Sequence, residues 1–182
     1  MKIQKVDHIV EETEGRARIL EGWQLKLVAS IAFLWSVFQL WYASPLPFMV
    51  GFGVFIDVPA RAIHLGFGLL LAFLSFPFFK KNRLKPFNFF NFLLSLLAVF
   101  VTFYLFFNYE NLVYRNGVLL KHPINFFGNS FNFPTELIIG FIGIILLLEA
   151  TRRAIGTPLV VVASIFLLYS IFGQIMPEMI SH

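Results

Sequence analysis

The chain has 182 residues, of which 58% are hydrophobic and only 13% charged, whereas an average soluble domain is about 45–50% apolar and about 25% charged. A soluble domain of this size could not bury so much apolar surface, so the composition excludes an ordinary soluble protein. The absence of cysteine excludes disulfides and thiolate-bound metals. The formal charge of +4 does not indicate a nucleic-acid partner, because the basic residues are distributed as membrane topology signals.

Five continuous apolar stretches dominate the sequence, and a helix needs about 20 such residues to cross a hydrocarbon core of about 30 Å. Membrane strands would instead alternate with a period of two. We therefore predict an all-α integral membrane protein, with a bundle of four transmembrane helices and a fifth, connector-like transmembrane helix. In chain order the predicted spans are Leu27–Ala43, Ala60–Phe79, Phe87–Phe107, Glu136–Leu148 with a continuation through Thr151, and Thr157–Met176.

The basic residues predict the orientation of these spans. Five lie before or at the edge of the first span, four lie in the Lys80–Lys85 turn and two lie after the fourth span, so eleven of the 14 share one side. By the positive-inside rule that side is cytoplasmic, and His182 is external. We expect a cytoplasmic N-terminal segment (residues 1–22), a four-helix membrane bundle (23–153) and a fifth transmembrane helix with an external C-terminus (154–182).

The connections differ in character. The stretch Ser44–Pro59 is predicted to be an external loop in the membrane interface, because it is apolar yet rich in Gly and Pro. The Asn108–Pro134 stretch is predicted to be a long external loop that lies against the membrane or a partner, since loops of more than about 12–15 residues are usually functional or disordered. Pro77 predicts a kink or an early end of the second span. Glycines 66, 68, 140 and 143 are predicted to give small faces for helix packing.

Charged residues at span boundaries are the candidate functional residues. Arg61 and His64 lie one turn apart at the start of the second span, and Asp57 precedes Arg61 by four residues, the favourable order for a helical ion pair. They could contact an anion or substrate. The alternative is that Arg61 extends to the outer headgroups and anchors the helix.

Glu149, Arg152 and Arg153 form a second cluster at the predicted cytoplasmic end of the fourth span. Glu149 and Arg153 are four residues apart, and the two arginines complement the helix dipole. The cluster either anchors the helix or pairs with another subunit. No histidine or carboxylate pair has metal-ligand spacing, and Ser/His/Asp catalysis has no support, so we expect no catalytic residue, metal or cofactor.

Three strings resemble a known family: RAIHLGFGLLLAFLSFP (Arg61–Pro77), LLLEATRRAIG (Leu146–Gly156) and PLVVVASIFLLYSIFGQIMP (Pro158–Pro177). Together they are similar to the N-terminal part of the membrane component of TRAP (tripartite ATP-independent periplasmic) transporters, of the type that works with a TAXI-class substrate-binding protein. The resemblance implies a small (Q-type) membrane subunit, or the small-subunit portion of a fused membrane component, in a bacterial or archaeal cytoplasmic (inner) membrane.

In such a transporter the resemblance implies a scaffold role. A large membrane subunit moves an organic acid, driven by an ion gradient, and the small subunit supports it and helps to receive the extracytoplasmic binding protein. The expected partners are therefore that large subunit, the binding protein and the lipid bilayer. The alternatives are a small membrane enzyme that uses Arg61 and His64 at the outer surface, and a stand-alone carrier or channel, which would need polar faces along its spans.

Overall fold

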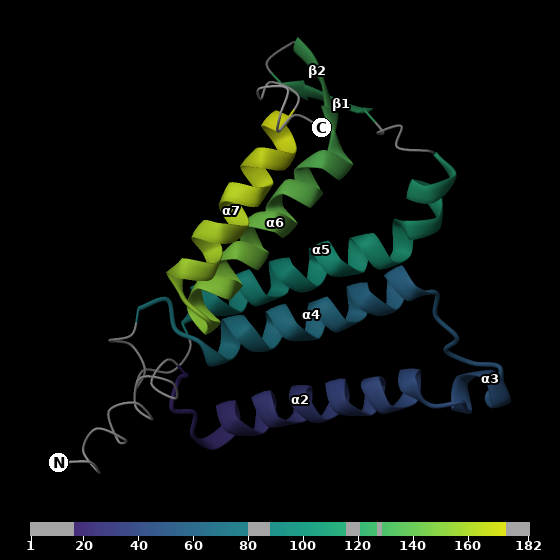
Figure 1. Cartoon of the computed structure of the whole chain (residues 1–182), viewed down its shortest axis with the longest axis vertical. Coiled ribbons are helices and arrows are strands. Elements are labelled where there is room, and N and C mark those ends of the chain that lie inside the picture. Colours follow the sequence, from purple (N-terminus) through teal and green to yellow (C-terminus); the bar gives the residue numbers. More distant parts are fainter. Residues whose placement is uncertain (1–16, 80–87, 116–120, 127–128, 174–182) are drawn as a thin grey trace.

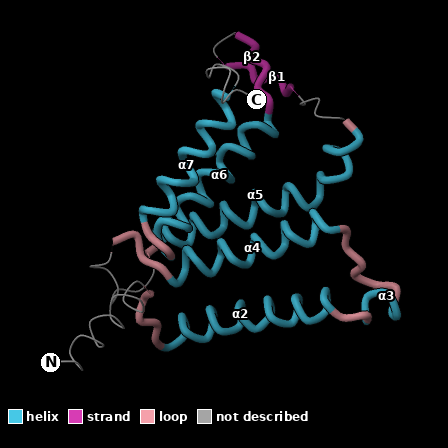
Figure 2. The backbone as a smooth tube through the Cα atoms, viewed as in Figure 1, coloured by secondary structure: helices cyan, strands magenta, loops and turns pink. Residues whose placement is uncertain are grey.

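The computed structural model describes residues 17–79, 88–115, 121–126 and 129–173, and the side chains of 121–133 are not described. Within these ranges a helix coincides with each of the five predicted apolar segments (Figures 1 and 2). A short helix and a two-stranded hairpin lie in the connections. The helices are α2 (Gly22–Ala43), α3 (Leu46–Val50), α4 (Asp57–Ser75), α5 (Phe89–Tyr114), α6 (Thr135–Ala154) and α7 (Thr157–Phe172), and the strands are β1 (Lys121–Phe126) and β2 (Asn129–Pro134).

Three of the described helices, α2, α4 and α5, are long and apolar enough to cross a membrane. Helix α6 has 20 residues but carries charges near both ends, and α7 has 16 described residues. Large apolar side chains are exposed along all five of these helices, which is the surface that lipid requires and water penalises. The structure thus fits a predominantly helical, multi-pass membrane protein, as the sequence predicts.

The described helices form a layer and an inclined hairpin (Figure 1). Helices α2, α4 and α5 run antiparallel to their neighbours, with α4 between the other two. Helices α6 and α7 are antiparallel to each other and inclined to that layer, and α6 contacts both α4 and α5. The core lies where these three helices meet, and its buried members are Leu69, Phe73, Ala98, Leu146 and Ala150.

One predicted packing glycine, Gly66, lies where α4 packs against α5. A Cβ atom at Gly66 would lie 2.8 Å from Oγ1 of Thr102, whose hydroxyl donates to the carbonyl oxygens of Ala98 (3.0 Å) and Val99 (2.9 Å). Gly143 likewise brings α6 close to α5, because a Cβ there would lie 3.0 Å from Cγ1 of Val101. These two glycines pack against neighbouring helices as predicted.

Gly68 and Gly140 differ from the other two glycines. A Cβ atom at either position would meet no atom within 4 Å. The prediction that they form helix-packing faces is therefore wrong within the described structure.

The prediction that Asn108–Pro134 is a loop is wrong over much of this stretch. Helix α5 continues to Tyr114, and strands β1 and β2 pair in antiparallel register from Lys121 opposite Pro134 to Phe126 opposite Asn129. The helix continues because its polar residues are satisfied along its own backbone: the side-chain amide of Asn108 donates to the Tyr104 carbonyl at 3.0 Å. The predicted boundary marked the end of apolar sequence and not the end of the helix.

The other connections refine the sequence predictions. The short helix α3 lies inside the predicted Ser44–Pro59 loop, and α4 begins at Asp57, before Pro59. At its other end α4 stops at Ser75, and Phe76 is extended (φ −111°, ψ 119°). Proline disfavours helical conformation in the residue before it, so Pro77 marks an early helix end and not a kink.

The helix directions bring together the span ends that the basic residues predict to share one side (Figure 1). The start of α2, the end of α4, the start of α5 and the end of α6 lie toward one end of the molecule (Figure 1). The Lys80–Lys85 turn, the first 16 residues, Met176 and His182 lie outside the described residues.

Reporter fusions at the N-terminus and in the Lys80–Lys85 turn should report the cytoplasm, and fusions in Asn108–Pro134 and at His182 should report the outside, since eleven of the basic residues share the first side. Alkaline phosphatase and green fluorescent protein activities provide the measurement. A cytoplasmic His182 would contradict a fifth span.

Candidate functional site

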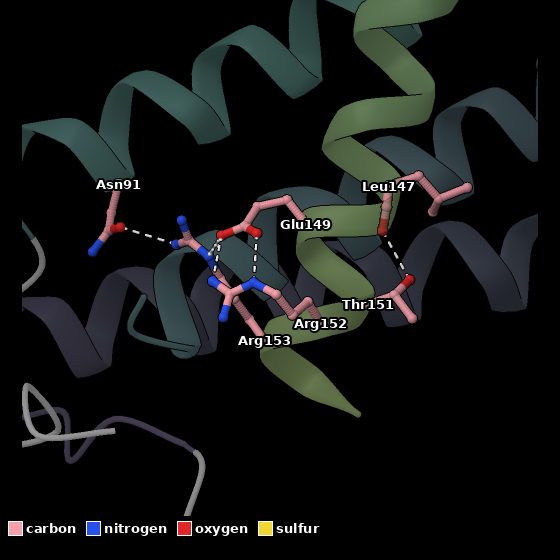
Figure 3. A network of polar contacts seen from close by, with 6 residues as sticks. All are labelled: Asn91, Leu147, Glu149, Thr151, Arg152 and Arg153. Atoms are coloured by element: carbon pink, nitrogen blue, oxygen red, sulfur yellow. Dashed lines mark hydrogen bonds and ion pairs between the residues drawn. The ribbon is translucent and has the colours of Figure 1, made fainter. Parts of the chain in front are cut away.

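The charged residues at the end of α6 form the densest polar contact network in the described structure, here called the arginine cluster: Glu149, Arg152 and Arg153, with Asn91 of α5 (Figure 3). Arg152 binds Glu149 through two bonds, from Nε to Oε2 at 2.7 Å and from Nη2 to Oε1 at 2.8 Å. Arg153 adds a bond from its Nε to Oε1 of the same carboxylate at 2.7 Å. One carboxylate therefore orients both guanidinium groups.

Arg153 is the buried centre of the arginine cluster. Its side chain is 0% exposed, against 32% for Arg152. Its Nη1 donates to Oδ1 of Asn91 at 3.0 Å, and its guanidinium carbon lies 5.0 Å from the centroid of the Phe73 ring, within cation–π range. Its Nη2 is buried with no hydrogen-bond partner among the described residues. Arg153 thus joins α6 to α5 and α4.

Arg18, which precedes α2, lies beside this cluster. It is buried, and its backbone N–H donates to the carbonyl oxygen of Ser75 at 2.7 Å. Burial, and after it the positive charge of Arg153, lowers the pKa of the Arg18 guanidinium. Among the described residues of this region, Arg18, Arg152 and Arg153 carry three positive charges and Glu149 one negative charge. The described part of the contact region therefore has a net positive charge.

Local sequence explains how α6 builds this cluster. Residues three and four apart share a helix face, so Glu149 reaches both Arg152 and Arg153, as the sequence predicts. The arginines occupy the last turn, where positive charge complements the exposed carbonyl groups. Gly156 then adopts φ 125°, a backbone conformation that residues other than glycine rarely adopt. The chain turns there directly into α7.

The other predicted group, which contains Arg61 and His64, does not form a joint site. Arg61 pairs with Asp57 as predicted, at 2.8 Å from Nη2 to Oδ2, but both side chains are more than half exposed. His64 instead faces α2: its Nδ1 accepts a hydrogen bond from Nε1 of Trp35 at 3.2 Å and lies in close contact with Nε2 of Gln39. Arg61 is therefore a surface residue, and His64 links α4 to α2.

Besides the contacts of His64 with α2, two further interhelical contacts were missing from the sequence predictions. One is the Asn91–Arg153 bond, and the other joins Arg115 to Glu136 at 2.5 Å from Nη1 to Oε1. The Glu136 side chain is only 4% exposed, although this residue begins a predicted span. Neither pair shares a helix, so no spacing rule could find it.

Within the described residues, no three His, Cys, Asp or Glu side chains gather closely enough to hold a metal ion. The arginine cluster has no nucleophile placed beside a general base. Its ion pairs and hydrogen bonds link α6 to a neighbouring helix. Comparisons of the sequence and fold with protein-family models, with curated proteins and with solved structures found no match.

Proposed function

We propose that the chain is a small scaffold subunit of a TRAP-type secondary transporter for organic acids. In this proposal it supports a large transport subunit, which uses an ion gradient, and helps to receive an extracytoplasmic substrate-binding protein. The observation that carries the proposal is the lack of a polar path along the described spans. Transporter cores usually contain interrupted helices with polar groups at the midplane.

Two buried hydroxyl groups illustrate this observation. Ser95 donates to the carbonyl oxygen of Phe92 at 2.7 Å, and Thr102 donates to carbonyls one turn back in the same helix. Both hydroxyls are therefore satisfied inside α5 and offer little to a passing solute. The remaining charged contacts lie near the helix ends, where they join helices to one another.

The arginine cluster supports a fixed role for the bundle. Arg153 holds α6 against Asn91 of α5 and Phe73 of α4, and breaking a buried ion pair costs about 3–5 kcal/mol. The arginine cluster therefore holds α4, α5 and α6 together. By contrast, α7 has no buried residue and α2 is largely exposed, which leaves apolar surface for a larger membrane partner.

The proposal has five helices cross the membrane, although only three of the described helices are long and apolar enough by themselves. Helices α2, α4, α5, α6 and α7 would all span a bacterial or archaeal cytoplasmic membrane, with the N-terminus inside and the C-terminus outside. Helices α6 and α7 would cross as an inclined hairpin. The arginine cluster would then lie at the cytoplasmic surface and the Asp57–Arg61 pair at the outer surface.

Reconstitution tests the scaffold role. In liposomes that carry an ion gradient, the chain alone should accumulate no organic acid, because its described spans offer no polar path. Uptake should require a large membrane subunit and a binding protein, supplied from the neighbouring reading frames. Radiolabelled uptake is the measurement, and protein-free liposomes set the background. Accumulation by the chain alone would favour a stand-alone carrier and overturn the proposal.

A further inference from the structure

His64 joins α4 to two side chains of α2 that lie one helical turn apart. Helix α2 lies at the edge of the helix layer and packs against α4 (Figure 1). Nδ1 of His64 accepts a hydrogen bond from Nε1 of Trp35 at 3.2 Å, and Nε2 of Gln39 lies in close contact with the same Nδ1. Because Trp35 and Gln39 are four residues apart, they share a face of α2. One ring nitrogen of α4 therefore receives both side chains.

The contact with Trp35 requires the neutral form of His64. The indole N–H can donate a hydrogen bond but has no acceptor atom. Nδ1 must therefore keep its lone pair, and the neutral ring carries its proton on Nε2. A proton on Nδ1 would place two N–H groups opposite each other, so Trp35 would lose its hydrogen bond.

Gln39 differs from Trp35, because a side-chain amide has both a donor and an acceptor. When its amide turns over, Oε1 of Gln39 can accept a hydrogen bond from the N–H of a charged imidazole, and such charge-assisted bonds are stronger than neutral ones. Between these two residues on α2, the ring of Phe38 packs against that of Phe67 with centroids 6.2 Å apart. This apolar contact does not depend on the charge of His64.

Charged side chains of the neighbouring helices do not contact His64 in the described structure. On its own helix, Arg61 lies one turn away and pairs with Asp57 at 2.8 Å. The charged residue of α2 is Lys26, which lies about 13 Å along the helix from Trp35. Helix α5 contributes Glu110, and the charges of α6 lie near its ends. Tyrosine stays neutral between pH 5 and 8, so a charge on His64 acts first on its two partners in α2.

We propose that His64 is a proton-dependent link between α4 and α2. The neutral ring accepts from Trp35, and the protonated ring donates to Gln39 instead. Histidine is the side chain that ordinarily changes charge between pH 5 and 8, and His64 is exposed. Acidification therefore releases Trp35, while Gln39 and Phe38 keep α2 attached. In the topology proposed above, external pH would act on this link, but the inference is independent of any role in transport.

The indole N–H resonance of Trp35 tests the release. It is recorded by ¹H–¹⁵N NMR of the full chain in detergent micelles, where the pH is the same on both sides, and is assigned by its loss in Trp35→Phe. His64→Leu, which has no acceptor, gives the reference position. We expect the wild-type resonance to lie away from this reference at pH 8 and to reach it at pH 5.

His64→Asn is the matched control, because its amide oxygen can accept from Trp35 and does not titrate. Its Trp35 resonance should stay in one place between pH 8 and 5. A wild-type resonance that does not move over this range would overturn the proposal. Equal movement in His64→Asn would also overturn it, because the pH effect would then come from another group.

Thermal unfolding in detergent tests the exchange of partners without replacing His64. Trp35→Phe should lower the midpoint more at pH 8 than at pH 5, because the bond that it removes is present only with the neutral ring. Gln39→Leu should lower the midpoint at both pH values, since Gln39 contacts either form. An equal effect of Trp35→Phe at both pH values would show that its bond survives protonation. An effect of Gln39→Leu confined to pH 8 would show that the charged ring does not bind Gln39. Either result would contradict the proposal.

Discussion

Replacing Arg153 by glutamate is expected to prevent stable assembly of the helices. The substitution removes the only described cation that joins α6 to Asn91, and it places a second carboxylate four residues from Glu149 in a site where the native side chain is 0% exposed. Breaking a buried ion pair costs about 3–5 kcal/mol before the repulsion is counted. The measurement is the midpoint of thermal unfolding in detergent, followed by size-exclusion chromatography, together with the yield of membrane-inserted protein.

Arg61→Glu is the matched control for this variant. It makes the same change of charge four residues after an acidic residue, Asp57, but the pair is exposed. Exposed ion pairs contribute about 0–1 kcal/mol, so this variant should unfold near the wild-type midpoint. Arg153→Lys should be intermediate, because an ammonium group cannot bind Glu149 and Asn91 with the planar fork of arginine. Equal midpoints for Arg153→Glu and Arg61→Glu would contradict the structural role of the cluster.

Substituting Gly66 by alanine is expected to destabilise the protein, although alanine normally stabilises a helix interior relative to glycine by about 0.8–1.0 kcal/mol. The new Cβ would lie 2.8 Å from Oγ1 of Thr102, and that β-branched side chain is buried and hydrogen-bonded to its own helix. Overpacking of this kind costs about 1–3 kcal/mol. The measurement is the midpoint of thermal unfolding in detergent. A midpoint below that of the wild type shows that the close contact outweighs the gain in helix propensity.

Two further variants isolate the contact. Gly68→Ala meets no atom within 4 Å, so it should stabilise the protein as helix propensity predicts. In the double variant Gly66→Ala, Thr102→Ala, the oxygen that causes the close contact is absent, and the effect of the alanine at position 66 should change from unfavourable to favourable. A double-mutant cycle gives the coupling between the two positions. An additive cycle would show that α4 and α5 do not pack through this pair.

The sequence predicts the helices well because apolar runs and charge spacing are local properties. All five predicted segments coincide with helices, and the Glu149–Arg153 pair follows from a separation of four residues. The Asn91–Arg153 contact spans 62 positions and the Arg115–Glu136 contact spans 21. Such pairs depend on the angle and depth at which helices pack, and single-sequence spacing carries no information about either quantity.

Burial likewise could not be predicted for two arginines that have the same spacing from an acidic residue. Arg61 and Arg153 both follow an acidic residue by four positions, yet one is exposed and the other is enclosed by three helices. The aromatic side chains of Phe73 and Phe78 make this difference, because they cover the Arg153 guanidinium from α4 and its C-terminal extension. Their role depends on where α4 stops, and the structure decides between the kink and the early helix end that Pro77 predicts.

The spacing of charges along α6 has a consequence for bilayer thickness. Only the 12 residues from Leu137 to Leu148 lie between Glu136 and Glu149, a rise of about 18 Å, against a hydrocarbon core of about 30 Å. If α6 crosses the membrane as proposed, hydrophobic mismatch would cost fractions of a kcal/mol per Å, and lipid beside α6 would have to thin locally or be replaced by protein. Along this flank, mismatch would then favour association with another membrane protein without any specific polar contact.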